Sequence, residues 1–192
     1  MAEEQEIRKK KKQGVGKSAA KDVAQIALTV SLIAVCAWTT IPIFLIPFTL
    51  QTFAVAFAGG LLGWKKGMIA VGAYILMGLV GIPVFSNFQA GTAVLFGPTG
   101  GYLFGFFFLT AITGLFKLVP VRNRWGRAGM LFGAMVLGMS VCYLFGTVWF
   151  MLMYKCTAGY ALTICVTPFL PADFVKFVLA AVLCVRTEKY IK

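Results

Sequence analysis

Residues 127–154 decide the fold class; they read RAGMLFGAMVLGMSVCYLFGTVWFMLMY, and Arg127 is their only charged side chain. A helix needs about 20 apolar residues to cross the roughly 30 Å hydrocarbon core of a bilayer, and this segment exceeds that length. It lacks the alternation of apolar and polar residues that is typical of a membrane β-strand. The segment therefore predicts a transmembrane helix that is long enough to tilt or to project beyond the bilayer.

Five further apolar segments have the same character, and they predict helices at 20–39, 50–64, 66–83, 99–118 and 171–187. The chain is 60% hydrophobic and only 12% charged, a composition that the surface of a soluble domain of 192 residues would not accommodate. We therefore expect an all-α integral membrane protein with six transmembrane helices in a single domain, residues 19–192. The polar residues 1–18 are expected to form a basic, disordered tail.

Two apolar stretches contain prolines and do not suit a spanning helix. Residues 39–49, TTIPIFLIPFT, must be irregular while still apolar, which suits a loop folded back as a lid over a cavity. Residues 156–169 are too few to span before prolines interrupt them, so a re-entrant or interfacial piece is expected. Cys156 and Cys165 share this segment and could form a disulfide.

The basic residues predict the orientation of the chain in the membrane. Sixteen of the eighteen Lys and Arg residues lie in the N-terminal tail, at the C-terminus and in two connections, 64–67 and 117–127. The three opposite connections contain only Lys155. Because positive charge accumulates on the cytoplasmic side, both termini are expected in the cytoplasm and the Pro-rich loops outside.

The charge pattern and the motifs exclude several classes of function. The net charge of +12 lies in short clusters and not on one folded face, so anionic lipids are expected partners and nucleic acid is not. The chain has no histidine, and its five cysteines lack metal-ligand spacing, which predicts no metal site. GVGKS, residues 14–18, has Lys11 where a nucleotide-binding loop needs glycine. Since no nucleophile is paired with a base, we expect neither an enzyme nor a bound cofactor.

One charge pair stands out in an apolar context, in PFLPADFVKF, residues 168–177. Asp173 is the only acidic residue between Asp22 and Glu188, and Lys176 follows one helical turn later. A charge in the hydrocarbon costs about 3 kcal/mol, so such residues usually face a cavity or a partner. At this spacing the two side chains can share a helix face and partly neutralise each other. The pair predicts either a ligand site or an ion pair that caps and anchors the helix.

Other polar and aromatic side chains are expected on the same outer side of the membrane. They occur at helix starts and in the outer loops: Phe44, Phe48, Thr49, Gln51, Thr52, Phe85, Ser86, Asn87, Phe88, Gln89, Thr92, Thr99, Tyr102 and Trp149. Together they could line an apolar pocket with a few converging hydrogen-bonding groups, as small-ligand sites generally do. The alternative is that the polar residues cap helices and the aromatic residues form an interfacial belt.

Small residues recur at helical spacing in two of the predicted helices. Helix 20–39 carries a continuous stripe, Ala20, Ala24, Ala27, Ser31 and Ala34. Such a stripe permits close contact between helices, either inside the protein or with a partner chain. Helix 127–154 has a similar row, Ala134, Gly138, Cys142 and Gly146, and helix 99–118 has the pair Gly101 and Gly105. Internal packing is the expected role of these last two sets.

Four stretches together resemble the BioY family, the biotin-specific substrate-capture (S) components of energy-coupling factor (ECF) transporters. They occur in family order: IPFTLQTFAVAFAGGLLG (46–63), GIPVFSNFQAG (81–91), FGPTGGYLFGF (96–106) and PFLPADFVKFVLAAVL (168–183). The resemblance implies a multi-pass protein of a bacterial-type cell membrane that captures biotin from outside. It also implies a transmembrane coupling subunit and two ATPase subunits as partners, which alone would bind ATP. Ala172 departs from the family pattern, where a glycine often precedes the acid.

The resemblance also implies roles for individual residues. Asp173, Lys176 and Asn87 would contact biotin, with Gln51 and Tyr102 as further candidates, while Thr99, Phe48 and Phe85 complete the substrate-binding set from the pocket prediction. The stripe Ala20, Ala24, Ala27 and Ser31 resembles the surface by which such components dock on the coupling subunit. Two alternatives stay open, an S component for a different vitamin and a noncatalytic membrane assembly subunit in which Asp173 and Lys176 form an interface salt bridge.

Overall fold

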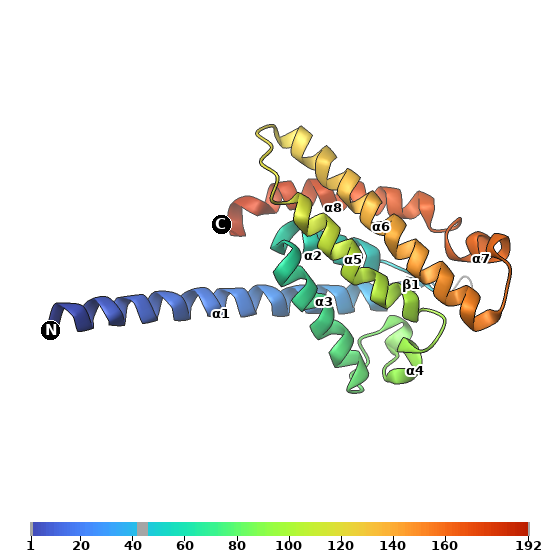
Figure 1. Cartoon of the computed structure of the whole chain (residues 1–192), viewed down its shortest axis with the longest axis horizontal. Helices are drawn as coiled ribbons and strands as arrows, with labels where there is room; N and C mark the ends of the chain where they lie inside the picture. The colour runs from blue at the N-terminus through green and yellow to red at the C-terminus, as the bar shows by residue number, and fades with distance from the viewer. Residues whose placement is uncertain (1, 42–45, 192) are drawn as a thin grey trace.

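The computed structural model describes residues 2–41 and 46–191, and its α-helices cross one another in a bundle (Figure 1). The helices are α1 Ala2–Trp38, α2 Gln51–Leu62, α3 Trp64–Leu79, α4 Thr92–Leu95, α5 Gly100–Phe116, α6 Arg124–Tyr154, α7 Ala158–Cys165 and α8 Leu170–Ile191. A 3₁₀ turn, η1, covers Ser86–Phe88. Two short antiparallel strands, β1 Thr40–Ile41 and β2 Phe48–Thr49, pair Thr40 with Thr49.

The six predicted helices correspond to α1, α2, α3, α5, α6 and α8, so the all-α class is confirmed. Two helical stretches, Ala19–Trp38 and Arg124–Tyr154, are long and apolar enough to cross a membrane. A third span results if α7 and α8, which meet at a bend of 47°, are counted as one broken span. The number of six spans and the cytoplasmic position of the termini stay predictions.

The N-terminal residues differ from the expected disordered tail, because α1 extends back to Ala2 and projects beyond the bundle (Figure 1). Glu, Gln, Lys and Ala dominate this stretch, and all four residue types favour helix. Extending an existing helix adds one hydrogen bond for each residue fixed, whereas starting a helix is costly. The composition of residues 2–18 alone does not indicate that the apolar residues after them nucleate the helix that these residues extend.

The two proline-containing stretches adopt different structures. Residues 156–169 contain the short helix α7 and not a span of its own, and Cys156 and Cys165 are free thiols. In the expected lid, residues 42–45, which include Phe44, lie outside the described residues. The rest of that stretch forms β1 and β2 beside the end of α1.

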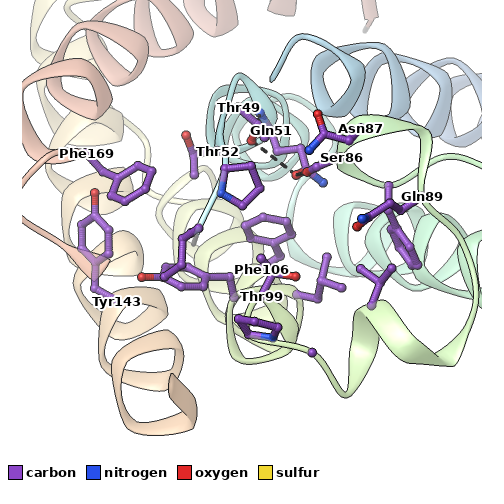
Figure 2. Close-up of a pocket in the computed structure, with 18 of the residues that line it drawn as sticks. Thr49, Gln51, Thr52, Ser86, Asn87, Gln89, Thr99, Phe106, Tyr143 and Phe169 are labelled. Carbon is purple, nitrogen blue, oxygen red and sulfur yellow. Dashed lines mark hydrogen bonds between the residues drawn. The ribbon is translucent and has the colours of Figure 1, made fainter. Parts of the chain in front are cut away.

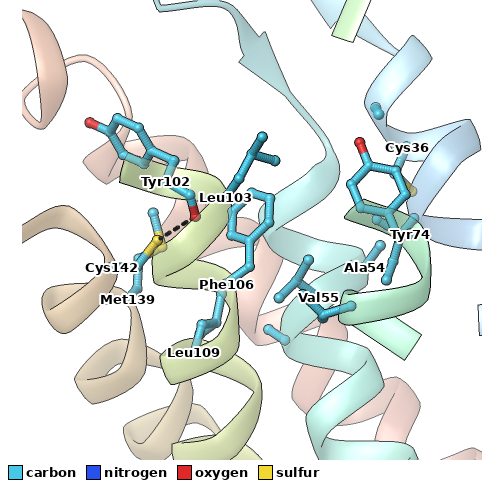
Figure 3. Packing of buried hydrophobic residues seen from close by; sticks show 14 of the residues in the cluster. Cys36, Ala54, Val55, Tyr74, Tyr102, Leu103, Phe106, Leu109, Met139 and Cys142 are labelled. Atoms are coloured by element: carbon cyan, nitrogen blue, oxygen red, sulfur yellow. Dashed lines mark hydrogen bonds between the residues drawn. The ribbon is translucent and has the colours of Figure 1, made fainter. Parts of the chain in front are cut away.

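Small residues bring α5 and α6 into close contact, as the sequence predicted. A Cβ atom added at Gly105 would lie 2.6 Å from Sγ of Cys142, and one at Gly138 would lie 3.0 Å from Cα of Leu109. The Cys142 thiol also donates to the Tyr102 carbonyl at 3.7 Å (Figure 3). Such contacts replace the hydrophobic driving force that is weak between helices inside a bilayer.

The contact at Gly105 generates a test in which the same substitution is made at two glycines. Gly105→Ala should destabilise the protein by about 1–3 kcal/mol, because the added methyl group overpacks the α5–α6 contact. Gly133→Ala on α6 is the matched control, since a Cβ there meets nothing within 4 Å and alanine favours helix by about 1 kcal/mol. Thermal unfolding of the purified proteins in detergent measures both. Equal melting temperatures for the two variants would contradict the packing role of Gly105.

Candidate functional site

A cavity of about 520 Å³ lies among α2, α5, α6, α8 and the segments that precede α2 and α5 (Figure 2). Its volume is in the range of small-molecule sites, which are typically apolar with a few placed polar groups. Apolar and aromatic side chains such as Leu103, Phe106 and Phe169 form much of the wall. The polar groups gather in two clusters, one around Asp173 and one around Gln51.

The first cluster is the predicted charge pair, at the start of α8. Asp173 and Lys176 are only 3% and 6% exposed, and Nζ of Lys176 donates to Oδ1 of Asp173 at 2.8 Å. The ammonium also donates to the carbonyl of Thr49 at 2.8 Å and to Oγ1 of Thr52 at 3.3 Å. Thr52 in turn donates to Oδ1 of Asp173 at 2.8 Å. All three protons of the buried ammonium can therefore be used, and α8 is tied to the start of α2.

Tyr143 completes this cluster from α6, although it was not among the residues predicted from the sequence. Its hydroxyl donates to Oδ2 of Asp173 at 2.6 Å. Oδ1 of Asp173 thus accepts two hydrogen bonds and Oδ2 one, so that Oδ2 has room for a further donor. The available signal was a phenol within an apolar helix, because a buried tyrosine hydroxyl usually finds a partner.

The second cluster orients Gln51, the first residue of α2. Its Nε2 donates to the hydroxyl of Tyr74 at 2.7 Å, and that hydroxyl donates to the carbonyl of Val84 at 3.1 Å. Oε1 of Gln51 accepts from Ser86 at 3.1 Å and from Thr49 at 3.3 Å. These bonds fix the orientation of the amide and connect α2 with α3 and with the loop that precedes α4.

Seven of the eight predicted substrate-binding residues line the cavity: Asp173, Lys176, Asn87, Gln51, Tyr102, Thr99 and Phe85. Asn87 lies on η1 in a left-handed conformation (φ 56°, ψ 32°), which asparagine tolerates better than most residues. Tyr102 donates its hydroxyl to the carbonyl of Cys165 at 2.6 Å and thereby joins α5 to the end of α7.

Phe48 is the exception, because it lies outside the cavity lining. Its ring stacks on Phe169 with 6.0 Å between centroids, and Nζ of Lys176 lies 4.2 Å from the ring centroid. Successive side chains of a strand point to opposite sides, and of the two residues of β2 Thr49 lines the cavity, whereas Phe48 only contacts the lining residues Phe169 and Lys176. The ring also gives the ammonium a favourable cation–π contact.

Several other pocket candidates can be placed in the same way. Thr49, Thr52, Ser86 and Gln89 line the cavity, whereas Phe88, Thr92 and Trp149 are outside its lining. Besides Tyr143, several apolar lining residues were not predicted from the sequence, among them Met139, Phe106 and Phe169, because their type does not distinguish a cavity wall from a core. Among the described residues, no three His, Cys, Asp or Glu side chains come together as a metal site would require.

The arrangement suits reversible binding of a small molecule. A carboxylate oxygen with a free acceptor position, a cation and several hydroxyl and amide groups converge on an apolar space. Charge-assisted hydrogen bonds in such surroundings are stronger than neutral ones, and they favour a ligand with N–H donors and a polar acceptor.

Comparison with known proteins gives a consistent result. The model of the BioY family matches residues 8–192. The biotin transporter BioY of Thermotoga maritima is 37% identical over 169 residues, which cover 88% of this chain and 96% of that protein. A probable biotin transporter BioY of Pyrococcus horikoshii is 36% identical, with 88% and 97% covered. A crystal structure of the S-component for biotin from an ECF-type ABC transporter superposes with a TM-score of 0.80 at 28% identity, covering 90% of this chain and 93% of that one.

The buried charge pair predicts non-additive effects on stability. Asp173→Asn or Lys176→Met alone should destabilise the ligand-free protein by about 3–5 kcal/mol, because each leaves one buried charge without its partner. The double variant should be more stable than either single variant, since no uncompensated charge remains. Denaturation in detergent measures all three. Lys66→Met is the control, because its partly exposed pair with Asp22 should contribute at most about 1 kcal/mol. Additive losses would contradict the coupling.

Proposed function

This chain belongs to the BioY family, and we propose that it captures biotin in the cavity and serves biotin uptake as the S component of an ECF transporter. The observation that carries the proposal is the buried Asp173–Lys176 pair in the wall of a cavity of about 520 Å³. The names of the relatives and of the superposed crystal structure support biotin as the ligand.

The chemistry of biotin complements the cluster around Asp173. Biotin has two ureido N–H donors, a ureido oxygen, an apolar bicyclic body and a carboxylate tail. The open acceptor position on Oδ2 of Asp173 would take a ureido N–H. Lys176 would donate to an acceptor of the ligand by giving up its 3.3 Å bond to Thr52, the longest of its three. Phe106 and Phe169 would enclose the rings.

The carboxylate tail would extend toward the second cluster. Lys176 is the sole Lys or Arg among the described lining residues, and its protons are already committed to the first cluster. Figure 2 has Tyr143 and Phe169 on one side of the cavity and Asn87, Ser86 and Gln89 on the other. The amide N–H groups of Asn87 and Gln89 there would bind the tail without a full positive charge, since each amide carries two donors.

Transport requires a partner, which we propose docks on α1. Ala20, Ala24, Ala27 and Ser31 are all exposed, whereas Ile33 and Ala37 on the other face are fully buried in the bundle. The Ser31 hydroxyl is satisfied within the helix, by the carbonyl of Ala27 at 3.0 Å. A face of small residues whose polar group is already hydrogen-bonded would let a helix of the coupling subunit approach closely. Two ATPase subunits would supply the energy for transport. Six spans with cytoplasmic termini, in a cell membrane, complete the proposal.

Ligand binding tests the proposed function directly. In a thermal-shift panel with biotin, riboflavin, thiamine and folate, only biotin should raise the melting temperature of the purified chain. Asp173→Asn and Lys176→Ala should each weaken biotin binding by about 2–5 kcal/mol in calorimetric titrations, because each breaks a desolvated, charge-assisted contact. Lys66→Ala, outside the cavity, is the control for the loss of a charge.

The other outcomes of the panel distinguish the alternatives. Stabilisation by a different vitamin would identify an S component of the same architecture for that vitamin. No stabilisation by any of the four would support an assembly subunit without a small ligand. Wild-type affinity in both Asp173→Asn and Lys176→Ala would remove the pair from the binding site.

The docking proposal has a separate test on α1. The double variant Ala24→Leu, Ala27→Leu should bind biotin with unchanged affinity but should lose uptake in cells that supply the energising subunits, because bulky side chains keep the partner helix away. Leu144→Phe, on an exposed position of α6, is the control and should retain uptake. Loss of binding together with uptake would indicate that the two alanines serve internal packing instead.

A further inference from the structure

The last residue of α1, Trp38, contacts the loop that carries one wall of the cavity. Its Nε1 donates to the carbonyl of Pro83 at 2.9 Å. Its ring stacks on Phe88, with 5.1 Å between centroids and 23° between planes. These two contacts lie on either side of the cavity residues Ser86 and Asn87. The end of α1 therefore contacts the loop both before and after the cavity residues Ser86 and Asn87.

Two residues between these contacts or at their edge, Asn87 and Phe88, have an unfavourable backbone conformation. Asn87 and Phe88 both have φ of 56°, in the left-handed region. Asparagine adopts this region at modest cost, but for a bulky residue such as Phe88 it is a genuine outlier, and surrounding contacts must hold it. Bonds within the loop, Phe85 to Gln89 at 3.1 Å and Gln89 to Ser86 at 3.3 Å, close the turn. They do not attach it to the bundle. The bonds of Val84 to Tyr74 and of Ser86 to Gln51 attach the first half of the loop, and the stack of Phe88 on Trp38 attaches the strained residues that follow.

The end of α1 also supports the neighbouring part of the wall, at the start of α2. The backbone N–H of Leu50 donates to the carbonyls of Cys36 at 3.2 Å and Thr39 at 3.3 Å. Leu50 lies between the cavity residues Thr49 and Gln51, so the start of α2 is attached to the same helix end. The loop with Ser86 and Asn87 and the start of α2 are thus both attached to the end of α1.

We propose that Trp38 is a positioning residue for ligand binding, although it lies outside the cavity lining. The inference rests on the proposed function. Trp38 holds Ser86 and Asn87 in the conformation that contacts the ligand, and it restrains the loop while the ligand is bound. Without its contacts the loop relaxes out of the left-handed conformation, and the wall opens more often. Because α1 also bears the exposed small-residue stripe, Trp38 connects the cavity to the helix on which a partner would dock.

The test compares three tryptophan variants of the full chain with biotin as the ligand. Trp38→Ala should raise Kd about tenfold, equivalent to about 1.4 kcal/mol, mainly through faster dissociation. Trp38→Phe keeps the ring stack and loses the N–H donor, so its Kd should lie between those of the wild type and Trp38→Ala. Trp125→Ala is the control, because Trp125 is 78% exposed and 18 residues before Tyr143, about 27 Å along α6, and its Kd should not change.

Hydrogen exchange of the ligand-free proteins gives a readout that does not depend on biotin. Residues 82–91 should exchange faster in Trp38→Ala than in the wild type or in Trp125→Ala, while α5 and α6 stay unchanged. Unchanged Kd and unchanged exchange at 82–91 in Trp38→Ala would overturn the proposal. If wild-type protein does not bind biotin, the proposed function fails, and the exchange result still decides whether Trp38 holds the loop.

A variant on the loop side covers the case in which Trp38→Ala does not fold. Phe88→Ala removes the same stack from an exposed position, since Phe88 is 62% exposed, and it should reproduce the faster dissociation. Wild-type binding by both Phe88→Ala and Trp38→Phe would overturn the proposal.

Discussion

The ion pair of Asp173 and Lys176 is the interaction on which the site depends. Burying two charges among apolar helices costs several kcal/mol unless both partners are fully hydrogen-bonded. Here the partners come from three other segments: the carbonyl of Thr49 on β2, the hydroxyl of Thr52 on α2 and the hydroxyl of Tyr143 on α6. Because both charges need hydrogen-bond partners, α8 must lie where it meets α2 and α6. The same requirement places polar groups in the lining of the cavity.

The helices around the cavity pack by different means. Close α5–α6 contact at Gly105 and Gly138 needs no polar group, because small residues let the helices approach and gain dispersion energy. On the opposite side the amide of Gln51 joins α2, α3 and the loop before α4. Lining residues of the cavity come both from the closely packed pair α5 and α6 and from the segments that the amide of Gln51 joins.

Sequence reasoning found the helices and most of the site for physical reasons. Segment length identifies helices in an apolar chain, and the cost of an isolated charge singles out Asp173 and Lys176. Tyr143 was missed because the position of a hydroxyl along a helix does not reveal which helix faces it. Phe48 was assigned to the cavity because the sequence does not show that it shares a strand with Thr49, where neighbouring side chains point to opposite sides. The helical start of α1 was missed because the polar residues there extend a helix that the apolar residues after them nucleate.

The internal hydrogen bonds of the ligand-free pair also bear on selectivity. Since Lys176 and Asp173 already satisfy each other, a ligand gains only what it adds to these bonds. An apolar molecule of the right size would add nothing at the free position of Oδ2 and would cover it from water. A molecule with an N–H donor next to a polar acceptor would fill that position and replace the long bond between Lys176 and Thr52. The pair thus disfavours apolar ligands by the cost of an unfilled acceptor, and this discrimination does not require a tight fit around the rings.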